Sequence, residues 1–304
     1  MKSLFASIGW VFWAATALAG TVGTPPQLVA EGSYYFNAGD YERAIRCCDE
    51  ALKVDPTYVD AWLTKGAAYV NLCRYKKALK CYEKAAALNP EDAQAWAGRA
   101  DVLRYEGRPR EALVYYEKAL ALDSVNTGYL AGKGDALIEG GSYDEGAAIL
   151  DDAAEASPTA WTYYYRGLGA LGRGRYDEAA RAFSSSASLN DSLFIYSYLL
   201  LYITKTSAGD ADARDVLGPA LAWPTRLWPR DVARLYAGEA TPADVLAAAG
   251  EDRVKQCEAY CFLGYYYQYA GDAKTARSYF KKAVRTGVHH DMEYRLAKRE
   301  LAPK

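Results

Sequence analysis

Small residues recur in this 304-residue sequence at a nearly constant interval. Three ladders of them keep the same phase. They are Gly32, Gly66, Ala100, Gly134 and Gly167, spaced 34, 34, 34 and 33 apart; Ala44, Ala78, Ala112, Gly146 and Ala179; and Ala51, Ala85, Ala119, Ala153 and Ser186. A fixed period of this length is typical of repeat architectures. The ladders therefore predict five consecutive copies of one structural unit.

Each unit is predicted to be a hairpin of two helices that cross closely. Small side chains at the crossing let the two backbones approach, and bulky side chains fill the space beside it. The bulky residues are Tyr35, Tyr69, Leu103 and Leu137 on the first helices, and Tyr82, Tyr116, Leu150 and Phe183 on the second. The turn between the helices needs a residue in the left-handed region, which glycine adopts easily. Gly39, Gly107, Gly141 and Gly174 stand there, with Cys73 in the second unit.

This pattern resembles the tetratricopeptide repeat, and the resemblance covers residues 25–191 as five repeats. The family implies an all-α fold, a right-handed superhelical solenoid of tetratricopeptide helix hairpins. Three units are generally enough for a stable stack. Because such a stack presents a long curved surface, we expect a scaffold or adaptor that binds other proteins or extended peptides.

The remainder is less regular. Residues 192–256 are predicted to form irregular helical hairpins, with helices over 192–206 and 211–222 and a short one capped by Thr241 and ending at Ala249. The repeat phase returns at Gly264, Gly271, Ala276, Phe280 and Ala283. Residues 257–304 are therefore predicted to form a final repeat and a capping helix over 291–302.

The second half also resembles the NlpI-type bacterial envelope proteins. The residues that carry this likeness are Leu235-Tyr236-Ala237-Gly238-Glu239, Tyr260-Cys261-Phe262-Leu263-Gly264-Tyr265-Tyr266, Gly271-Asp272, Phe280-Lys281-Lys282-Ala283-Val284, Val288 and Glu293-Tyr294. That family implies a homodimeric adaptor that brings an envelope protease to peptidoglycan-remodelling enzymes. The sequence departs from it in having Thr21 in place of the lipid-bearing cysteine and in the five regular repeats before the shared half.

The N-terminus predicts export. No charge occurs between Lys2 and Glu31, and an apolar run ends in the small-x-small pattern Ala17-Leu18-Ala19. We therefore interpret residues 1–19 as a signal peptide and 20–24 as a linker, and expect a periplasmic or secreted protein without a stable membrane anchor. An uncleaved N-terminal helix that anchors the chain is the alternative, although its apolar core is shorter than the ~20 residues that span a bilayer.

The candidate binding residues line the inner face, which we define as the face formed by the first helices of the hairpins. They are Asn37, Asn71, Asp101, Arg104, Tyr105, Asp135, Glu139, Tyr164 and Tyr165. Asn and Tyr side chains suit a peptide backbone, and the acidic members favour a basic ligand. The clamp by which chaperone-binding repeats hold a C-terminal carboxylate needs lysines, but Val29, Leu63 and Ala97 occupy those places. A solvated wall without ligand, or a groove for muropeptides, are the alternatives.

Catalytic, cofactor and metal sites are not expected. Gly167-Leu168-Gly169-Ala170-Leu171-Gly172 spells a dinucleotide-binding motif, but Gly167 is a helix-crossing residue and no βαβ unit surrounds it. The only histidines, His289 and His290, are adjacent and so cannot easily share a metal, although Asp291 and Glu293 lie nearby. An enzyme with a site in 192–256 is the remaining alternative. The net charge of −2 argues against nucleic-acid binding.

Four basic residues, one before each of four crossing residues, are expected to pack their stems along the hairpins with their heads in water: Lys65, Arg99, Lys133 and Arg166. The basic residues near the C-terminus are likewise interpreted as a solvated terminal helix, with a phosphate-binding patch as the alternative. The six cysteines are expected to be small packing residues. Cys47 and Cys81 are one repeat apart, about 10 Å and too far for a disulfide, and Cys257 and Cys261 lie on one helix face.

Overall fold

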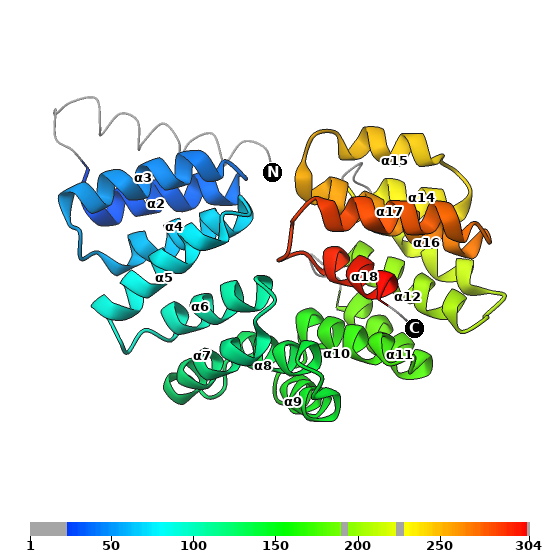
Figure 1. The fold of residues 1–304 in the computed structure, drawn as a ribbon, viewed down its shortest axis with the longest axis horizontal. Coiled ribbons are helices and arrows are strands. Elements are labelled where there is room, and N and C mark those ends of the chain that lie inside the picture. Colours follow the sequence, from blue (N-terminus) through cyan, green and yellow to red (C-terminus); the bar gives the residue numbers. More distant parts are fainter. Residues whose placement is uncertain (1–22, 190–193, 223–227, 303–304) are drawn as a thin grey trace. The chain divides into compact units, whose positions relative to one another are not determined.

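The computed structural model describes residues 23–189, 194–222 and 228–302, and every regular element in these ranges is a helix. The predicted all-α class is therefore confirmed (Figure 1). None of the helices in these ranges is long and apolar enough to cross a membrane. The predicted signal peptide, residues 1–19, lies outside the described residues.

The chain forms two compact units, one ending at Gly98 and the other beginning at Arg99. Unit 1 contains α2 (Pro25–Asn37), α3 (Tyr41–Val54), α4 (Val59–Asn71) and α5 (Tyr75–Leu88), and α6 (Ala93–Tyr105) begins in it and continues into unit 2. Unit 2 continues with α7 (Pro109–Leu122), α8 (Thr127–Glu139), α9 (Tyr143–Ala156), α10 (Ala160–Gly172) and α11 (Tyr176–Ser188). Its later helices are α12 (Phe194–Ser207), the 3₁₀-helix η1 (Ala213–Leu217), α13 (Gly218–Ala222), α14 (Arg230–Ala237), α15 (Pro242–Ala249), α16 (Arg253–Tyr269), α17 (Ala273–Arg285) and α18 (Met292–Leu301).

The hairpins cross where the three ladders of small residues predict. Every ladder position is buried. A Cβ atom added to Gly66 would lie 3.0 Å from Cζ of Tyr82, and one added to Gly167 would lie 2.6 Å from Cε1 of Phe183. In these two repeats the bulky side chain of the second helix packs directly on the backbone of the first, so a larger residue at the crossing would push the helices apart.

The turns inside the hairpins have the predicted left-handed residue. Gly39 has a φ of 79° and Gly107 one of 77°, and Cys73 adopts 55° in the second repeat. A non-glycine residue in this region is unfavourable because its Cβ approaches the following carbonyl oxygen. The glycine ladder and its single exception are both confirmed.

The irregular stretch agrees with the prediction in part. α12 and α15 form as expected, and the Thr241 side chain caps α15 by accepting from the Asp244 amide. The single helix predicted over 211–222 is wrong, because η1 and α13 replace it. Pro219 would lie inside such a helix, where it has no amide hydrogen to donate and its ring collides with the preceding turn. The sequence analysis also missed α14, which buries Val232, Ala233, Leu235 and Tyr236 on one face.

Candidate functional site

Unit 1 carries an open groove of about 390 Å³ on its inner face, lined by residues of α2, α4 and α6. Val29 and Leu63 form its floor, each with 7% of its surface exposed. Asn37, Asp60 and Gln94 are exposed and line it as well. The groove therefore combines an apolar base with polar groups at its edge.

Asn37 and Asn71, the two asparagines predicted to bind a ligand in unit 1, differ in their exposure and hydrogen bonding. Asn37 is exposed and lines the groove. Asn71 is half-buried, and its Nδ2 donates to the carbonyl oxygen of Ala67 on its own helix at 3.0 Å. One amide donor of Asn71 is therefore engaged within α4.

The inner face of unit 2 holds a buried polar network around Arg104, whose side chain is 2% exposed. Arg104 Nη1 lies 2.7 Å from Asp135 Oδ2 and 3.4 Å from Glu139 Oε1, both on α8. Its Nε donates to the Tyr116 hydroxyl on α7 at 3.3 Å, and that hydroxyl donates to Asp101 Oδ1. Burial raises the pKa of Tyr116 well above its usual range, and the Asp101 carboxylate adds to the shift. Tyr116 is therefore the neutral donor in this network.

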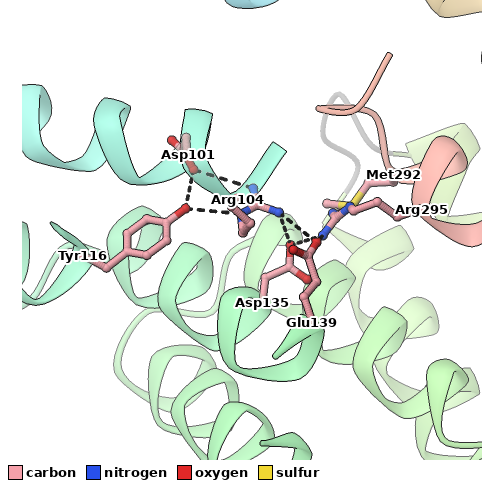
Figure 2. Close-up of polar contacts among 7 residues, drawn as sticks. All are labelled: Asp101, Arg104, Tyr116, Asp135, Glu139, Met292 and Arg295. Atoms are coloured by element: carbon pink, nitrogen blue, oxygen red, sulfur yellow. Dashed lines mark hydrogen bonds and ion pairs between the residues drawn. The ribbon is translucent and has the colours of Figure 1, made fainter. Parts of the chain in front are cut away.

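A second arginine enters the network from the last helix. Arg295 on α18 donates through Nη1 to Asp135 Oδ2 and to Glu139 Oε1, the latter at 2.5 Å. Its Nη2 also contacts the sulfur of Met292. Figure 2 shows the two guanidinium groups on either side of the Asp135 and Glu139 carboxylates. The C-terminal helix thus occupies part of the face that was predicted to bind a ligand.

The aromatic members of the predicted groove are also covered. The Tyr105 ring is half-buried and meets His290 edge-on at a centroid distance of 5.9 Å. Tyr164 is only 2% exposed and packs against Phe183 at 5.9 Å. Burial raises the pKa of Tyr165 to about 12, a shift that Arg104 opposes.

The burial of these side chains corrects the expectation that the inner face of unit 2 is open to a ligand. Arg104, Asp135 and Tyr164 are exposed by only 4%, 6% and 2%, so a ligand has no direct access to them. Because Asp135 and Glu139 are paired with two arginines, they offer little attraction to a basic ligand. The role of the nine residues in binding stays a prediction.

Sequence analysis missed Arg295, Tyr116 and Met292 as members of this site. A signal existed for part of the network: Arg104 precedes Asp135 by 31 positions and Glu139 by 35, so the three side chains occupy similar places on neighbouring first helices. No local pattern points to Arg295, which was assigned to a solvated terminal helix. That assignment is corrected, because the Arg295 side chain is 20% exposed and ion-paired.

The other motifs have structural roles. The glycines of 167–172 lie inside α10, where a Cβ on Gly169 would come within 2.8 Å of Ile138. Of the basic ladder, Lys65, Lys133 and Arg166 pair with Asp49, Glu117 and Asp151 on the preceding second helices, rather than only reaching water. Arg99 lies 4.1 Å from the centre of the Tyr115 ring. All six cysteines are free thiols.

His289 and His290 are half-buried in the turn between α17 and α18. His289 lies 4.6 Å from the Tyr294 ring, and burial lowers the pKa of His290 to about 4. Within the described residues, the group of metal-ligating side chains close enough to share an ion consists of Glu258, Asp291 and Glu293. This group is distinct from the Arg104 network and is considered below.

Comparison with known sequence families identifies the repeat. Profiles described as "Tetratricopeptide repeat" match residues 35–102, 98–160 and 258–286, which together span just over half of the chain. The chain belongs to the tetratricopeptide repeat family. Proteins of this family are protein-interaction scaffolds, which bind proteins or peptides.

Solved structures agree on the fold. The type IV pilus biogenesis factor PilW superposes with a TM-score of 0.58 and 22% identity, covering 66% of this chain and 93% of PilW. TTC0263, a thermophilic tetratricopeptide repeat protein of Thermus thermophilus, superposes with a TM-score of 0.53 and 18% sequence identity. The match covers 61% of this chain and 99% of TTC0263. The human IFIT1 dimer with m7Gppp-AAAA superposes with a TM-score of 0.57 and 19% sequence identity. The match covers 86% of this chain and 72% of the IFIT1 chain. At these identities the likeness concerns the fold alone.

Proposed function

We propose that this tetratricopeptide repeat protein is a non-enzymatic scaffold that binds an extended polypeptide segment in the groove of unit 1. The observation that supports this most is the contrast between the two inner faces. The unit 1 groove is open, and the polar side chains of Asn37, Asp60 and Gln94 are exposed along its edge above a mostly buried apolar base. The matching residues of unit 2 are engaged with one another and with α18.

An extended peptide suits such a groove because it presents backbone amides and alternating side chains. The carboxamides of Asn37 and Gln94 each offer a donor and an acceptor, as a peptide group requires. Val29, Leu63 and Ala67 offer apolar contact to one ligand side chain. Of the described residues that line the groove, Asp60 is the one that carries a charge, so we expect at most a weak preference for basic peptides.

Site-specific photocrosslinking tests this placement. A photoreactive amino acid is introduced at Asn37 or Gln94, and the full chain is incubated with an array of extended peptides. Lys53, exposed on the second helix α3, is the control position because it lies off the groove. We expect peptide adducts at positions 37 and 94 and none at 53. Adducts of equal yield at position 53, or binding of muropeptides without peptides, would contradict the proposal.

The cellular setting is proposed from the sequence. The apolar segment before Ala19 supports export to the periplasm or the exterior, where the scaffold, as a homodimer, recruits envelope proteases or peptidoglycan-remodelling enzymes. Mass spectrometry of the mature N-terminus checks the export, since a chain that still begins at Met1 is not processed. Sedimentation at micromolar concentration checks the dimer. Turnover of a substrate that survives substitution of the groove residues would contradict the non-enzymatic assignment.

A further inference from the structure

Three acidic side chains meet in the interior of unit 2, and none of them belongs to the groove of unit 1 or to the ion pairs of Arg104. Glu258 belongs to α16, Asp291 stands at the N-cap position of α18 without a side-chain capping hydrogen bond, and Glu293 lies in the first turn of α18. One carboxylate oxygen from each lies within 4.8 Å of the other two. Glu258 is 6% exposed and Glu293 only 2%. Buried carboxylates this close to one another need a compensating charge or protons.

The hydrogen bonds of this cluster leave oxygens unused. Glu258 Oε2 accepts from the Tyr196 hydroxyl at 2.8 Å and from Trp228 Nε1, so two donors hold that carboxylate in place. In contrast, Asp291 Oδ2 and Glu293 Oε1 are buried and have no hydrogen-bond partner among the described residues. A buried acceptor without a partner is unfavourable and uncommon in folded proteins. The two orphaned oxygens are therefore the feature that most requires a ligand.

Among the residues that the structure describes, the groups around the cluster do not supply the missing charge. Arg295 is the cation that acts on Glu293, but its Nη1 is bound to Asp135 and Glu139. Other groups that face the cluster are Cys257, Tyr164 and Tyr196, none of which is cationic. Burial, followed by the repulsion from Glu293, raises the pKa of Glu258 to about 8. Burial and the neighbouring carboxylates also raise the pKa of Asp291 well above its usual range.

We propose that Glu258, Asp291 and Glu293 bind one divalent cation of the hard, oxygen-preferring class, such as Ca²⁺, Mg²⁺ or Mn²⁺. Carboxylate oxygens are the ligands that these ions prefer. The hydrogen bonds from Tyr196 and Trp228 orient the Glu258 carboxylate, as outer partners commonly do for metal ligands. A bound cation would give the orphaned oxygens a partner and would take the place of the protons that burial otherwise favours on these carboxyl groups.

The proposed site joins α16 to the first turn of α18. Glu293 precedes Arg295 by two residues, and Arg295 reaches into the Asp135 and Glu139 pair. A cation bound here would therefore fix the start of the helix that covers the inner face of unit 2. This inference does not depend on peptide binding in unit 1, since no residue of that groove takes part.

The test uses the full chain, freed of metal with a chelator and then titrated with CaCl₂, MgCl₂ or MnCl₂ in a calorimeter. We expect saturable binding of one ion per chain and a rise in the melting temperature, because a ligand that binds only the folded state stabilises it. Terbium(III) provides a local readout, since the Trp228 indole beside Glu258 should sensitise its luminescence.

Two variants and one control make the test specific. Glu293→Gln and Asp291→Asn keep the shape of the side chain and remove mutual repulsion, so both are expected to fold, which circular dichroism checks. Each should weaken binding by at least ~10-fold. Glu300→Gln changes a partly buried carboxylate of the same helix outside the cluster and should leave binding unchanged. Absence of saturable binding by the wild-type chain, or equal binding by Glu293→Gln, would overturn the proposal in favour of carboxyl groups that share protons.

Discussion

Arg295 and Asp135 form an ion pair in unit 2 although 160 positions separate them in the sequence. The same oxygen of Asp135, Oδ2, also accepts from Arg104. One buried carboxylate therefore joins α6, α8 and α18 (Figure 2). The last helix, α18, therefore contacts the middle repeats through side-chain ion pairs in addition to capping the C-terminal end of the solenoid.

Removal of the Arg104 side chain should be strongly destabilising. Arg104→Ala removes the most deeply buried cation of the network, so that Asp135 and Glu139 keep Arg295 and the Tyr116 hydroxyl keeps Asp101 as described partners. Loss of one member of a buried ion pair costs about 3–5 kcal/mol. Urea denaturation followed by circular dichroism measures the free energy of unfolding. Arg108→Ala is the control, because Arg108 pairs with Glu111 at the surface and should cost no more than about 1 kcal/mol. Equal losses in the two variants would contradict the network.

Arg295→Ala should loosen α18 without unfolding the hairpins. The amides of residues 292–301 are expected to exchange hydrogen faster, because the link to Asp135 and Glu139 is lost. Hydrogen exchange with mass spectrometry reports this directly. Lys298→Ala serves as the matched control, since Lys298 lies exposed on the same helix. An unchanged exchange rate in Arg295→Ala would mean that packing of the apolar face alone holds α18.

Two glycines of α10 should respond oppositely to alanine. A Cβ on Gly167 would lie 2.6 Å from the Phe183 ring, and overpacking of this kind costs about 1–3 kcal/mol. A Cβ on Gly172 meets only Arg299 Nη1, at 3.6 Å, so Gly172→Ala should be neutral or stabilising by about 0.5–1 kcal/mol. Thermal melts of the two variants check the difference. If both substitutions were harmless, the close crossing at Gly167 would be wrong.

The thiols should differ in reactivity. Burial raises the pKa of Cys48 to about 12 and that of Cys81 to about 11, so at pH 8 almost none of either is the reactive thiolate. Cys257 and Cys261 are fully buried, whereas Cys47 and Cys73 are half-exposed. Alkylation at pH 8 followed by peptide mapping should label only positions 47 and 73. Labelling at Cys48 or Cys81 before denaturation would contradict the packing of unit 1.

The hairpins were predictable because a close helix crossing requires a small residue at a fixed position of each repeat. Only small residues fit at positions such as Gly66 and Gly167, so their period gives the register of each repeat. The break at Pro219 was missed because the apolar pattern of 211–222 was given more weight than the effect of proline inside a helix. The short helix α14 carries too few periodic positions to stand out.

The candidate site was less predictable, for a physical reason. Repeat phase places Asn37 and Arg104 on first helices, but it says nothing about what covers them. Whether Arg295 faces water or Asp135 depends on where α18 packs, and contacts at a separation of 160 residues leave no local pattern. The cluster of Glu258, Asp291 and Glu293 was hard to predict for the same reason. Asp291 and Glu293 follow the histidines, whereas Glu258 lies on α16, and only the packing of α18 brings them together.

A short connection, residues 286–291, tethers α18 to α17. A tethered segment competes with free ligands at an effective concentration that short linkers raise to about the millimolar range. Any external ligand for the inner face of unit 2 therefore binds with an affinity reduced by the fraction of molecules in which α18 is released. Conditions that release the helix would convert a closed surface into a second docking face on the same molecule.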